Sequence, residues 1–346
     1  MTTDADLPAT PSAEPPHQEA SDMLLSRAAE AVYWTGRYLE RAESTARIIK
    51  VHTELYLDLP RSAGLGWDPL LAITGSAEGY EDLYPPKPDQ VSHEEDIVCF
   101  LTADSRNHSS IVASLAAARE NMRTTRPIFP RELWEALNNL FLLTSENAEE
   151  AVPRRTRLRW LDDVLADCQR LTGVMAGTMS HDDAYSFLRI GRHVERADMT
   201  TRVLDVRAGA LAEAGDDLRP YTDLTWMSVL KSLAAYQMYR RKVQSRVTGP
   251  EALRFLLQDP QFPRSVEYCL VGISRLLLEL PRHEAAMATC AAAEALVADA
   301  KVKALAWDGL HEYVDELQLM LDTLHGNLSE TYFKVEAPAQ VMLATA

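Results

Sequence analysis

The feature that most constrains this chain is an eight-residue sequence that occurs twice. Gly36–Glu43 reads Gly-Arg-Tyr-Leu-Glu-Arg-Ala-Glu, and Gly191–Asp198 reads Gly-Arg-His-Val-Glu-Arg-Ala-Asp. The two copies are offset by 155 residues. A chance likeness between two amphipathic helices explains the apolar matches but not the shared Gly-Arg-x-x-Glu-Arg-Ala. We therefore predict that a unit of about 155 residues is present twice.

The same offset recurs further along the chain, which supports the duplication. Trp67 and Trp226 stand four residues out of this register, so insertions must separate the matched blocks. The further matches at the 155-residue offset are Phe100-Leu101 with Phe255-Leu256, Asp104 with Asp259, Ser110-Ile111 with Ser265-Val266, and Leu115 with Leu270.

Composition and periodicity predict an all-α fold. The chain is 47% hydrophobic and 25% charged, which is globular composition, and good helix formers dominate it. Strand-like alternation never persists, and Asp68-Pro69 and Ser92 are helix-start signals. We predict a large helical bundle built from two sequence-related halves. The expected helices are 23–58, one from 68, 93–103, 109–125, 130–152, 155–178, 181–214, 223–245, 250–258, 263–280, 282–305 and 308–333.

The predicted domain organisation follows from the repeat and the prolines. Residues 1–21 are polar and Pro-rich and predict a disordered leader. We assign 22–152 to the first repeat, 153–179 to a connecting helix and 180–335 to the second repeat. Residues 336–346 are expected to form a flexible tail.

The acidic charge argues against nucleic acid as a partner. A net charge of −16 repels the phosphate backbone. Two basic runs occur, Arg154–Arg159 and Arg240–Lys242. Because charge runs are usually solvated, and acidic Glu146–Glu150 precedes the first run, we interpret them as surface or locally neutralised residues.

Most other sequence motifs of known function are absent from this sequence. The four cysteines form no C-x-x-C pair, so we expect free thiols in a reducing compartment. The sequence has no signal-peptide pattern and no long apolar run, which predicts a cytoplasmic protein without a membrane span. Neither a metal-ligand spacing nor a nucleotide or serine-hydrolase motif is found, so we expect no cofactor and no metal. We interpret His311 as a surface residue and His193 as a packing residue.

Charged residues of each signature fall on one stripe of a helix. Positions i, i+3 and i+4 share a helix face, so each copy groups two arginines around one glutamate. A further arginine lies one to two turns on. The candidate residues are Arg37, Glu40, Arg41 and Arg47 in the first copy, and Arg192, Glu195, Arg196 and Arg202 in the second.

Three interpretations of the two stripes are open at this point. The first is a solvated helix face, whose Glu–Arg pairs contribute only a few tenths of a kcal/mol each. The second is a buried or half-buried ion-pair network that fixes how the two halves dock, because an Arg fork holds a carboxylate bidentately. The third is a site for an anion or a peptide carboxylate, in which the glutamates orient the arginines or bind an amine.

Gly36 and Gly191 stand inside the expected helices, where glycine costs about 1 kcal/mol relative to alanine. Close contact between two helices would explain a glycine in both copies. Asn121 and Arg123 are secondary candidates, because they could add polar groups to a cleft. A polar helix surface is the favoured interpretation of both.

These residues make the chain similar to the bacterial alpha-E domain family, which is named for its helices and its Glu-Arg motif. The resemblance covers residues 23–335, and here the motif is Glu40-Arg41 and Glu195-Arg196. Met122-Arg123 stands where the family usually has Ala-Arg, a departure that affects no assigned role. Arg264 lies in a matching segment and is a third secondary candidate. The matching segments are Met23–Arg27, Tyr33–Glu43, Ala118–Arg123, Gly191–Asp198 and Asp259–Val266.

The resemblance implies partners rather than a mechanism. Members of the family are typically encoded beside, or fused to, circularly permuted ATP-grasp proteins and transglutaminase-like proteins. This association suggests a system that forms or trims amide bonds. The leading hypothesis is a non-catalytic helical partner of an ATP-grasp amide or peptide ligase, which binds that enzyme or presents a peptide or small anionic ligand near the two stripes.

Two alternatives remain beside this hypothesis. The protein could be an enzyme in its own right, with Glu40 or Glu195 as general base. Two arginines beside each glutamate would lower its pKa, which disfavours a base. The protein could also be a purely structural interaction protein, whose motifs only hold the bundle together.

Overall fold

The computed structural model describes residues 24, 26–60, 66–84, 93–213 and 222–334, with the backbone alone for 207–213. Within these ranges the fold is all-α, as predicted, and contains no strand. The α-helices are α1 (Ser26–Asp58), α2 (Asp68–Thr74), α3 (Ala77–Leu83), α4 (His93–Thr102), α5 (Ile111–Thr124), α6 (Arg131–Glu146), α7 (Arg154–Thr178), α8 (Asp183–Glu213), α10 (Thr222–Ser232), α11 (Tyr236–Lys242), α12 (Gly249–Gln258), α13 (Val266–Leu277), α14 (Glu284–Ala298), α15 (Val302–Leu305) and α16 (Leu310–Leu328). Short helical turns are η2 (Arg126–Ile128), η3 (Ala148–Ala151) and η5 (Ser329–Phe333).

The predicted leader 1–21, the tail 336–346 and the start signal Ser92 lie outside the described residues. The division into repeats at 22–152, 153–179 and 180–335 stays a prediction.

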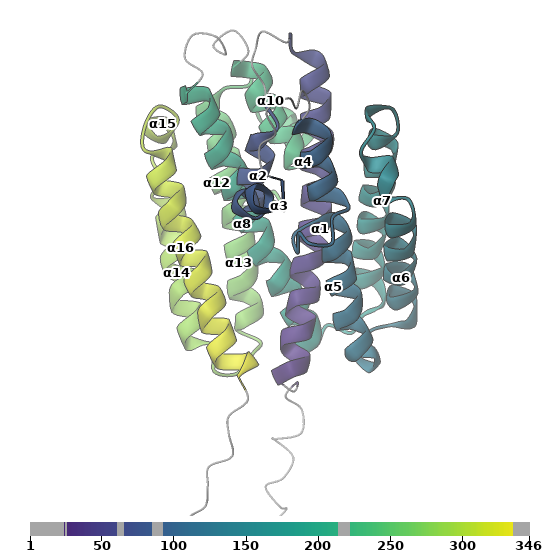
Figure 1. The fold of residues 1–346 in the computed structure, drawn as a ribbon. Helices are drawn as coiled ribbons and strands as arrows, with labels where there is room; N and C mark the ends of the chain where they lie inside the picture. Colours follow the sequence, from purple (N-terminus) through teal and green to yellow (C-terminus); the bar gives the residue numbers. More distant parts are fainter. Residues whose placement is uncertain (1–23, 25, 61–65, 85–92, 214–221, 335–346) are drawn as a thin grey trace, which may run out of the picture.

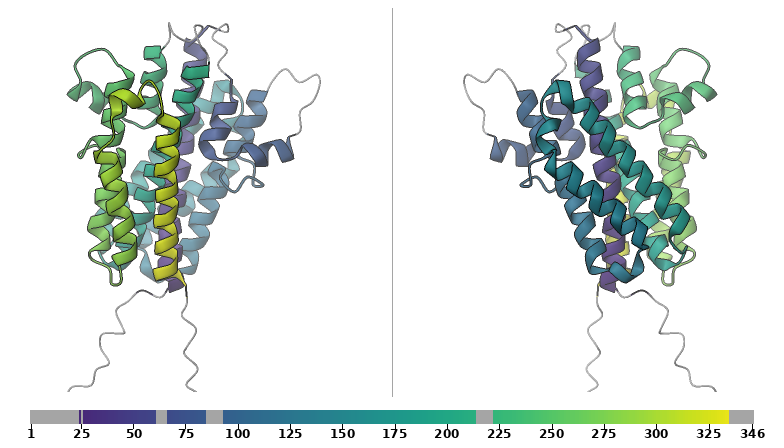
Figure 2. Two further views of the ribbon diagram at one scale, coloured as in Figure 1. Left: turned by 90° about the vertical axis from the view of Figure 1, so that its left-hand side faces the viewer. Right: turned by 90° about the vertical axis from the view of Figure 1, so that its right-hand side faces the viewer.

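The two helices that carry the signature form the centre of the bundle. α1 packs along α8 more extensively than along any other helix. On one side α5 and α7 cover α1, and α6 packs on both of them. On the other side α13 and α16 cover α8, and α14 packs on both of these. The long helices therefore lie side by side, with the short α2 and α3 against one face (Figures 1 and 2).

The outer helices follow the expected apolar stripe. In α13, Val266, Cys269, Leu270, Ile273 and Leu277 recur at helical spacing and are all fully buried. The central helices differ, because α1 buries polar and charged residues on a second face as well. A helix that is buried on more than one face must pack against several neighbours, which places α1 inside the bundle.

α1 and α8 meet at the two signature glycines. A Cβ atom on Gly36 would overlap the backbone carbonyl oxygen of Leu188, and one on Gly191 would overlap that of Tyr33. No larger residue fits at either position without moving a helix. This contact confirms the reason predicted for a glycine in each signature helix.

Several helix ends differ from the prediction. The expected helix 223–245 is broken into α10 and α11, where Ala234 adopts a φ of 52°. The expected helix 282–305 is likewise divided between α14 and α15. Asp68 is not the N-cap of α2, since Trp67 holds that position and no side chain caps it. The sequence did not predict either break, because the two expected helices contain good helix formers and neither helix contains glycine or proline.

Ser110 and Ser265 play the same local part at the 155-residue offset. Each side-chain oxygen accepts a hydrogen bond from a backbone N–H three residues later, that of Ala113 at 3.2 Å and that of Tyr268 at 3.1 Å. Both serines are therefore N-caps, of α5 and α13. That the chain arose by duplication stays a prediction.

The four cysteines are free, as predicted. Burial raises the pKa of Cys269 and of Cys290 to about 12. In the described part of the chain, no helix combines the length and apolar character needed to cross a bilayer.

Candidate functional site

The Glu-Arg motifs pair across the interface between α1 and α8, not within each helix. Glu195 of α8 accepts hydrogen bonds from two arginines of α1. Arg37 Nε lies 2.6 Å from Oε2, while Arg41 donates from Nε to Oε1 at 2.6 Å and from Nη2 to Oε2 at 3.0 Å. The arginines of one signature therefore hold the glutamate of the other.

Glu40 of α1 is held in the reciprocal way by α8. Arg196 donates from Nε to Oε1 at 2.9 Å and from Nη2 to Oε2 at 2.7 Å, and Arg192 Nη2 lies 3.0 Å from Oε2. A third guanidinium, that of Arg264 in the segment before α13, donates from Nη1 to Oε1. Glu40 therefore has three arginine partners and Glu195 has two among the described residues.

The network is buried and its glutamates are ionised. The side chains of Glu40 and Glu195 are 0% and 1% exposed. Burial alone would raise their pKa values, but the arginines outweigh it, so the pKa of Glu195 lies below its usual range and that of Glu40 far below. A carboxylate with a lowered pKa is a weak base near neutral pH, which argues against both as general bases.

A second acidic residue extends each cluster. Glu43 Oε1 accepts from Arg47 Nη2 at 2.7 Å and from Arg264 Nη2 at 2.6 Å. Asp198 Oδ1 accepts from Arg202 Nε at 2.9 Å. We call the set around Glu40 the Glu40 cluster and the set around Glu195 the Glu195 cluster. The Glu40 cluster comprises Glu40, Glu43, Arg47, Arg192, Arg196 and Arg264, and the Glu195 cluster comprises Arg37, Arg41, Glu195, Asp198 and Arg202.

The structure brings most of the candidate residues together. All eight stripe residues and Arg264 belong to the two clusters, which excludes the solvated helix face. Arg123 lies elsewhere, since it pairs with Glu120 on the end of α5 and is 57% exposed. Its neighbour Asn121 makes side-chain contact with neither cluster in the hydrogen bonds of the described residues. Both fit the polar helix surface that the sequence favoured.

Sequence reasoning did not select Glu43 and Asp198, although both stand at the eighth position of the signature. Their acidic character in both copies was the available signal. It also did not select His325, on α16, whose ring stacks on Tyr33 and whose Nδ1 lies 3.0 Å from the Tyr33 hydroxyl. Burial lowers the pKa of His325, so its ring is neutral at pH 7.

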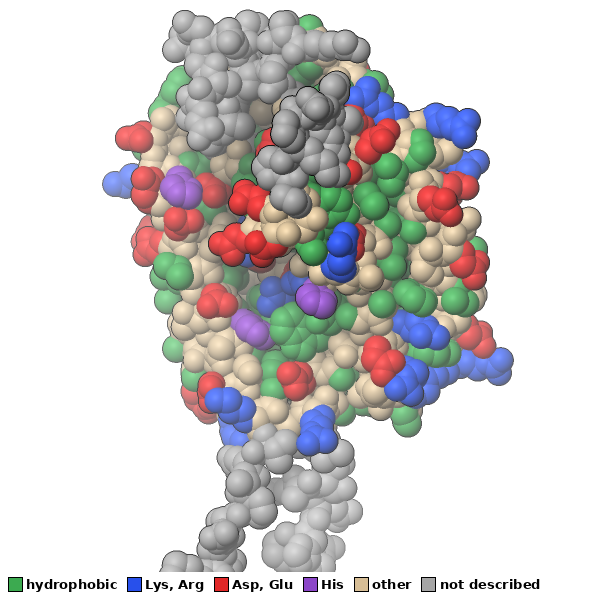
Figure 3. Space-filling model, viewed as in Figure 1, with side chains coloured by type: hydrophobic (Ala, Val, Ile, Leu, Met, Phe, Trp, Pro, Cys, Tyr) green, Lys and Arg blue, Asp and Glu red, His purple; other side chains and the backbone are tan. Residues whose placement is uncertain are grey.

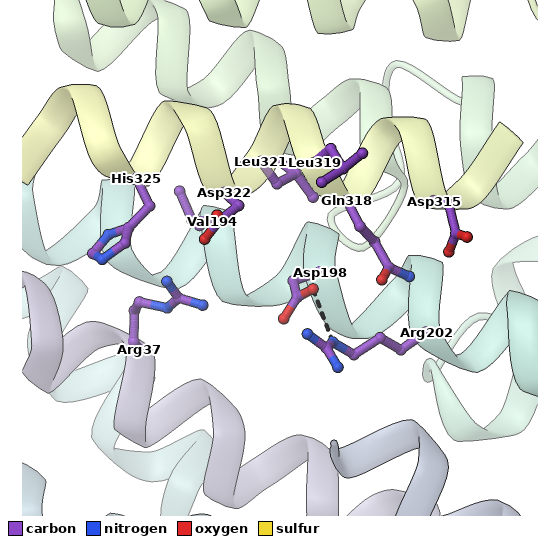
Figure 4. A pocket seen from close by; sticks show the side chains of 10 residues that line it. All are labelled: Arg37, Val194, Asp198, Arg202, Asp315, Gln318, Leu319, Leu321, Asp322 and His325. Atoms are coloured by element: carbon purple, nitrogen blue, oxygen red, sulfur yellow. Dashed lines mark hydrogen bonds and ion pairs between the residues drawn. The ribbon is translucent and has the colours of Figure 1, made fainter. Parts of the chain in front are cut away.

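A pocket of about 390 Å³ opens beside the Glu195 cluster, between α1, α8 and α16. Figure 4 shows Arg37, Asp198 and Arg202 on one side of it and side chains of α16 on the other. Basic and histidine side chains also gather in the middle of the face seen in Figure 3. The pocket is lined by Arg37, Val194, Asp198, Arg202, Asp315, Gln318, Leu319, Leu321, Asp322 and His325, and we call it the α16 pocket.

Two smaller pockets of about 200 Å³ flank the central helices. One contains His193, which is buried and whose pKa is strongly lowered by burial and then by nearby arginines. Its ring packs against Gly272, as expected for a packing residue. The other, which we call the Ser109 pocket, adjoins the Glu195 cluster. It is lined by Arg41, Thr45, Thr74, Gly75, Ser109, Glu195, Asp198, Met199 and Arg202.

One basic run departs from the prediction. Arg157 is not a surface residue, because its side chain is 0% exposed. Its guanidinium donates to Glu94 Oε1 at 2.7 Å and to the carbonyl of Ala151 at 3.1 Å. It also lies 5.2 Å from the ring centroid of Trp67. The surface interpretation fails for Arg157 alone in this run, since Arg159 is 69% exposed and pairs with Glu150. A charge run predicts solvation on average, while a buried acid neutralises one member of it.

His311 is a surface residue, as predicted. Its Nδ1 lies 2.8 Å from Asp205 Oδ1, and Asp315 is nearby. These three residues could offer ligand atoms within 4.8 Å of one another, but His311 is 68% exposed. Exposed acidic groups of this kind are common without a metal.

A Glu-Arg motif on helices is also what describes a known family. The model of the Alpha-E family, described as "a predicted alpha-helical domain with a conserved ER motif", matches residues 24–333. This chain belongs to the Alpha-E family. In this Alpha-E protein the glutamates and arginines of the two signatures pair across the interface between α1 and α8.

Relatives of this Alpha-E protein occur in mycobacteria. Uncharacterised proteins of Mycobacterium bovis and of two strains of Mycobacterium tuberculosis are each 25% identical to it over 273 residues. The match covers 72% of this chain but only 29% of each relative, so the chain spans a minor part of their length. No solved structure matches this Alpha-E protein.

Proposed function

We propose that this protein is a non-catalytic helical partner of an ATP-grasp amide or peptide ligase, and that it holds a peptide substrate of the ligase in the α16 pocket. The observation that carries the proposal is the buried, crossed ion-pair network beside an open pocket. The network fixes the central helices, and the pocket offers charged groups at its wall.

The network supports a binding role over a catalytic one. Glu40 and Glu195 are the acids of the family motif, and each is already held by at least two guanidinium groups. A general base needs a pKa near the working pH and access to a substrate proton. The lowered pKa values of these two carboxylates do not meet the first condition.

The α16 pocket suits a ligand that carries both charges. Arg37 and Arg202 can donate to a carboxylate, and Asp198 and Asp322 can accept from an amine. Leu319 and Leu321 add apolar surface. The volume of about 390 Å³ falls within the usual range for small-molecule pockets. A short peptide with a free carboxylate, or a small anion, meets this description.

The choice of partner follows from the family resemblance, in which ATP-grasp and transglutaminase-like proteins accompany Alpha-E proteins. A partner of an ATP-dependent ligase works where ATP is present, so the proposal places the protein in the cytoplasm. We propose that the ligase is the direct partner and that the transglutaminase-like protein acts in the same system.

Affinity purification of the tagged full-length protein from its native host tests the partnership. We expect the ATP-grasp protein of the same system to co-purify and the two purified proteins to form a complex of defined stoichiometry. A monomer that does not bind the purified ATP-grasp protein would overturn the proposal.

A plug in the α16 pocket tests the peptide role separately. Gln318→Trp fills the pocket without replacing a residue of either cluster, and Glu316→Trp places the same bulk elsewhere on α16. We expect Gln318→Trp to weaken binding of the peptide substrate of the ligase about tenfold or more by isothermal titration calorimetry, while Glu316→Trp binds as the parent does. Equal binding by both variants would contradict the assignment of this pocket.

A further inference from the structure

The two clusters differ by one guanidinium group. In the Glu40 cluster, Arg264 bridges the two acids, donating from Nη1 to Glu40 Oε1 and from Nη2 to Glu43 Oε1. Its side chain is only 11% exposed. Arg264 comes from the segment before α13, outside the signature, and closes the cluster from the side.

Among the described residues, the Glu195 cluster has no arginine that plays the part of Arg264. At the 155-residue offset, the residue that corresponds to Arg264 is Ser109, in the segment before α5. Ser109 lines a pocket of about 200 Å³ together with Glu195 and Asp198. The pocket therefore lies where the guanidinium of a third arginine would lie.

The acids facing the Ser109 pocket have fewer donors than their counterparts. Among the described residues, Glu40 Oε1 accepts from two arginines, whereas Glu195 Oε1 accepts from Arg41 alone. Glu43 Oε1 accepts from two arginines, whereas the one described donor to the Asp198 carboxylate is Arg202. Each acid of the Glu195 cluster is thus short of the bond that Arg264 provides in the other cluster.

A buried hydroxyl in the pocket is also without a partner. Thr200 donates from Oγ1 to the backbone carbonyl of Arg264 at 3.0 Å. Its counterpart Thr45 is 1% exposed and lines the Ser109 pocket, and its Oγ1 has no hydrogen-bond partner among the described residues. An unsatisfied buried hydroxyl is costly, so a ligand group that reaches Thr45 gains a hydrogen bond that the described residues do not supply.

The Glu40 cluster shows which charge such a pocket accepts. The charged residues at the Ser109 pocket are Arg41, Arg202, Glu195 and Asp198. Their counterparts at the 155-residue offset carry the same charges and surround a guanidinium. The counterparts are Arg196, Arg47, Glu40 and Glu43. Asp198 is one methylene shorter than Glu43, which leaves more room for a ligand.

We propose that the Ser109 pocket is a binding site for a guanidinium group, such as that of an arginine side chain or of agmatine. The planar cation donates to Glu195 and Asp198 as Arg264 does to Glu40 and Glu43. Burial raises the pKa of Asp198, which is consistent with a carboxylate that lacks full neutralisation. The Ser109 pocket shares Asp198 and Arg202 with the α16 pocket, but the proposal does not depend on the existence of a ligase partner.

Titration of the full-length protein with agmatine and with methylguanidinium at low ionic strength tests the site. We expect saturable binding at one site by calorimetry and a rise in Tm. Ser109→Arg supplies the missing guanidinium from the chain, so it should raise the Tm without ligand and weaken agmatine binding about tenfold or more. Ser105→Arg is the matched control, because it adds the same side chain at an exposed position of the same segment and should bind as the parent does.

The reverse variant gives a second, independent measurement. Arg264→Ser opens the Glu40 cluster, and we expect agmatine to restore part of the Tm that this variant loses and to bind at two sites rather than one. If Arg264→Ser does not fold, the comparison of Ser109→Arg with Ser105→Arg still tests whether the Ser109 pocket binds a guanidinium group. Absence of agmatine binding to the parent, equal binding by Ser109→Arg, or tighter binding of methylammonium than of methylguanidinium would overturn the proposal.

Discussion

The Glu40 and Glu195 clusters start from the same signature but end with different surroundings. Both contain a buried glutamate held by two arginines of the opposite helix. Only the Glu40 cluster is closed by an arginine from outside the signature, while a pocket adjoins the Glu195 cluster. The signature therefore sets the crossing of α1 and α8, and the segments before α5 and α13 decide whether a cluster is closed or open.

The largest expected effect concerns what the clusters share, the glycine contact. Gly36→Ala and Gly191→Ala each place a Cβ atom against a backbone carbonyl of the opposite helix. The backbone cannot move aside as a flexible side chain can, so α1 and α8 must move apart. The Glu–Arg distances in both clusters then increase. We expect each variant to lose more than about 4 kcal/mol of unfolding free energy, measured by urea denaturation.

Gly173→Ala provides the control. Gly173 lies inside α7 with no atom within 4 Å of an added Cβ. This variant should gain up to about 1 kcal/mol from helix propensity. Equal losses at all three glycines would contradict the close contact.

Removal of one acid at a time separates the two clusters. Glu40→Gln leaves three buried arginines without their carboxylate, and Glu195→Gln leaves two. Loss of one partner of a buried ion pair costs about 3–5 kcal/mol. We therefore expect Glu40→Gln at the upper end of this range and Glu195→Gln at the lower end, by urea denaturation. A greater loss for Glu195→Gln would reverse the ranking of the two clusters.

Acid titration should reveal the same glutamates. Their pKa values are lowered in the folded state, so their contribution is complete above the unfolded value of about 4.5. As the pH falls below this value, these glutamates bind protons in the unfolded chain but not in the folded protein, and the free energy of unfolding decreases. We expect unfolding free energy measured from pH 7 to pH 3 to fall less steeply below pH 4.5 in Glu40→Gln than in the parent. Identical slopes would mean that Glu40 is not held as described.

The smallest expected effect concerns the acids at the eighth position of the signature. Burial raises the pKa of Asp198 above 3.8, so its ionisation opposes folding once the pH exceeds that value. Asp198→Asn should therefore change the unfolding free energy at pH 7 by less than about 1 kcal/mol. Glu43→Gln removes the carboxylate that Arg47 and Arg264 share and should cost more. Tm measurements on the two variants compare them directly, and a larger loss for Asp198→Asn would contradict the openness of the Glu195 cluster.

The helices and the signature glycines followed from the sequence because they depend on local rules. Pro60 and Pro153 limit helices, and apolar spacing marks α13 as a buried face. Helix spacing also grouped Arg37 with Glu40 on one stripe. The same spacing could not show that Arg37 pairs with Glu195 instead, because the choice depends on how closely α1 and α8 approach.

Burial of single charges was equally beyond the sequence. Arg157 stands among three other arginines, and only the position of Glu94 on a distant helix selects it for the core. The Ser109 pocket could not be predicted either. The pocket exists because residue 109 is a serine and not an arginine. The comparison of Ser109 with Arg264 becomes possible only when the structure shows each residue beside the acids of its cluster.

Crossed pairing also imposes an order on biosynthesis. The ribosome completes α1 well before the second signature has been translated. Glu40 and its neighbours therefore stay solvated until their arginine partners have been synthesised. The nascent N-terminal segment can form helices, but it cannot yet form the buried ion pairs between α1 and α8. Commitment to the native state therefore falls late in translation, when Arg192, Arg196 and finally Arg264 emerge from the exit tunnel.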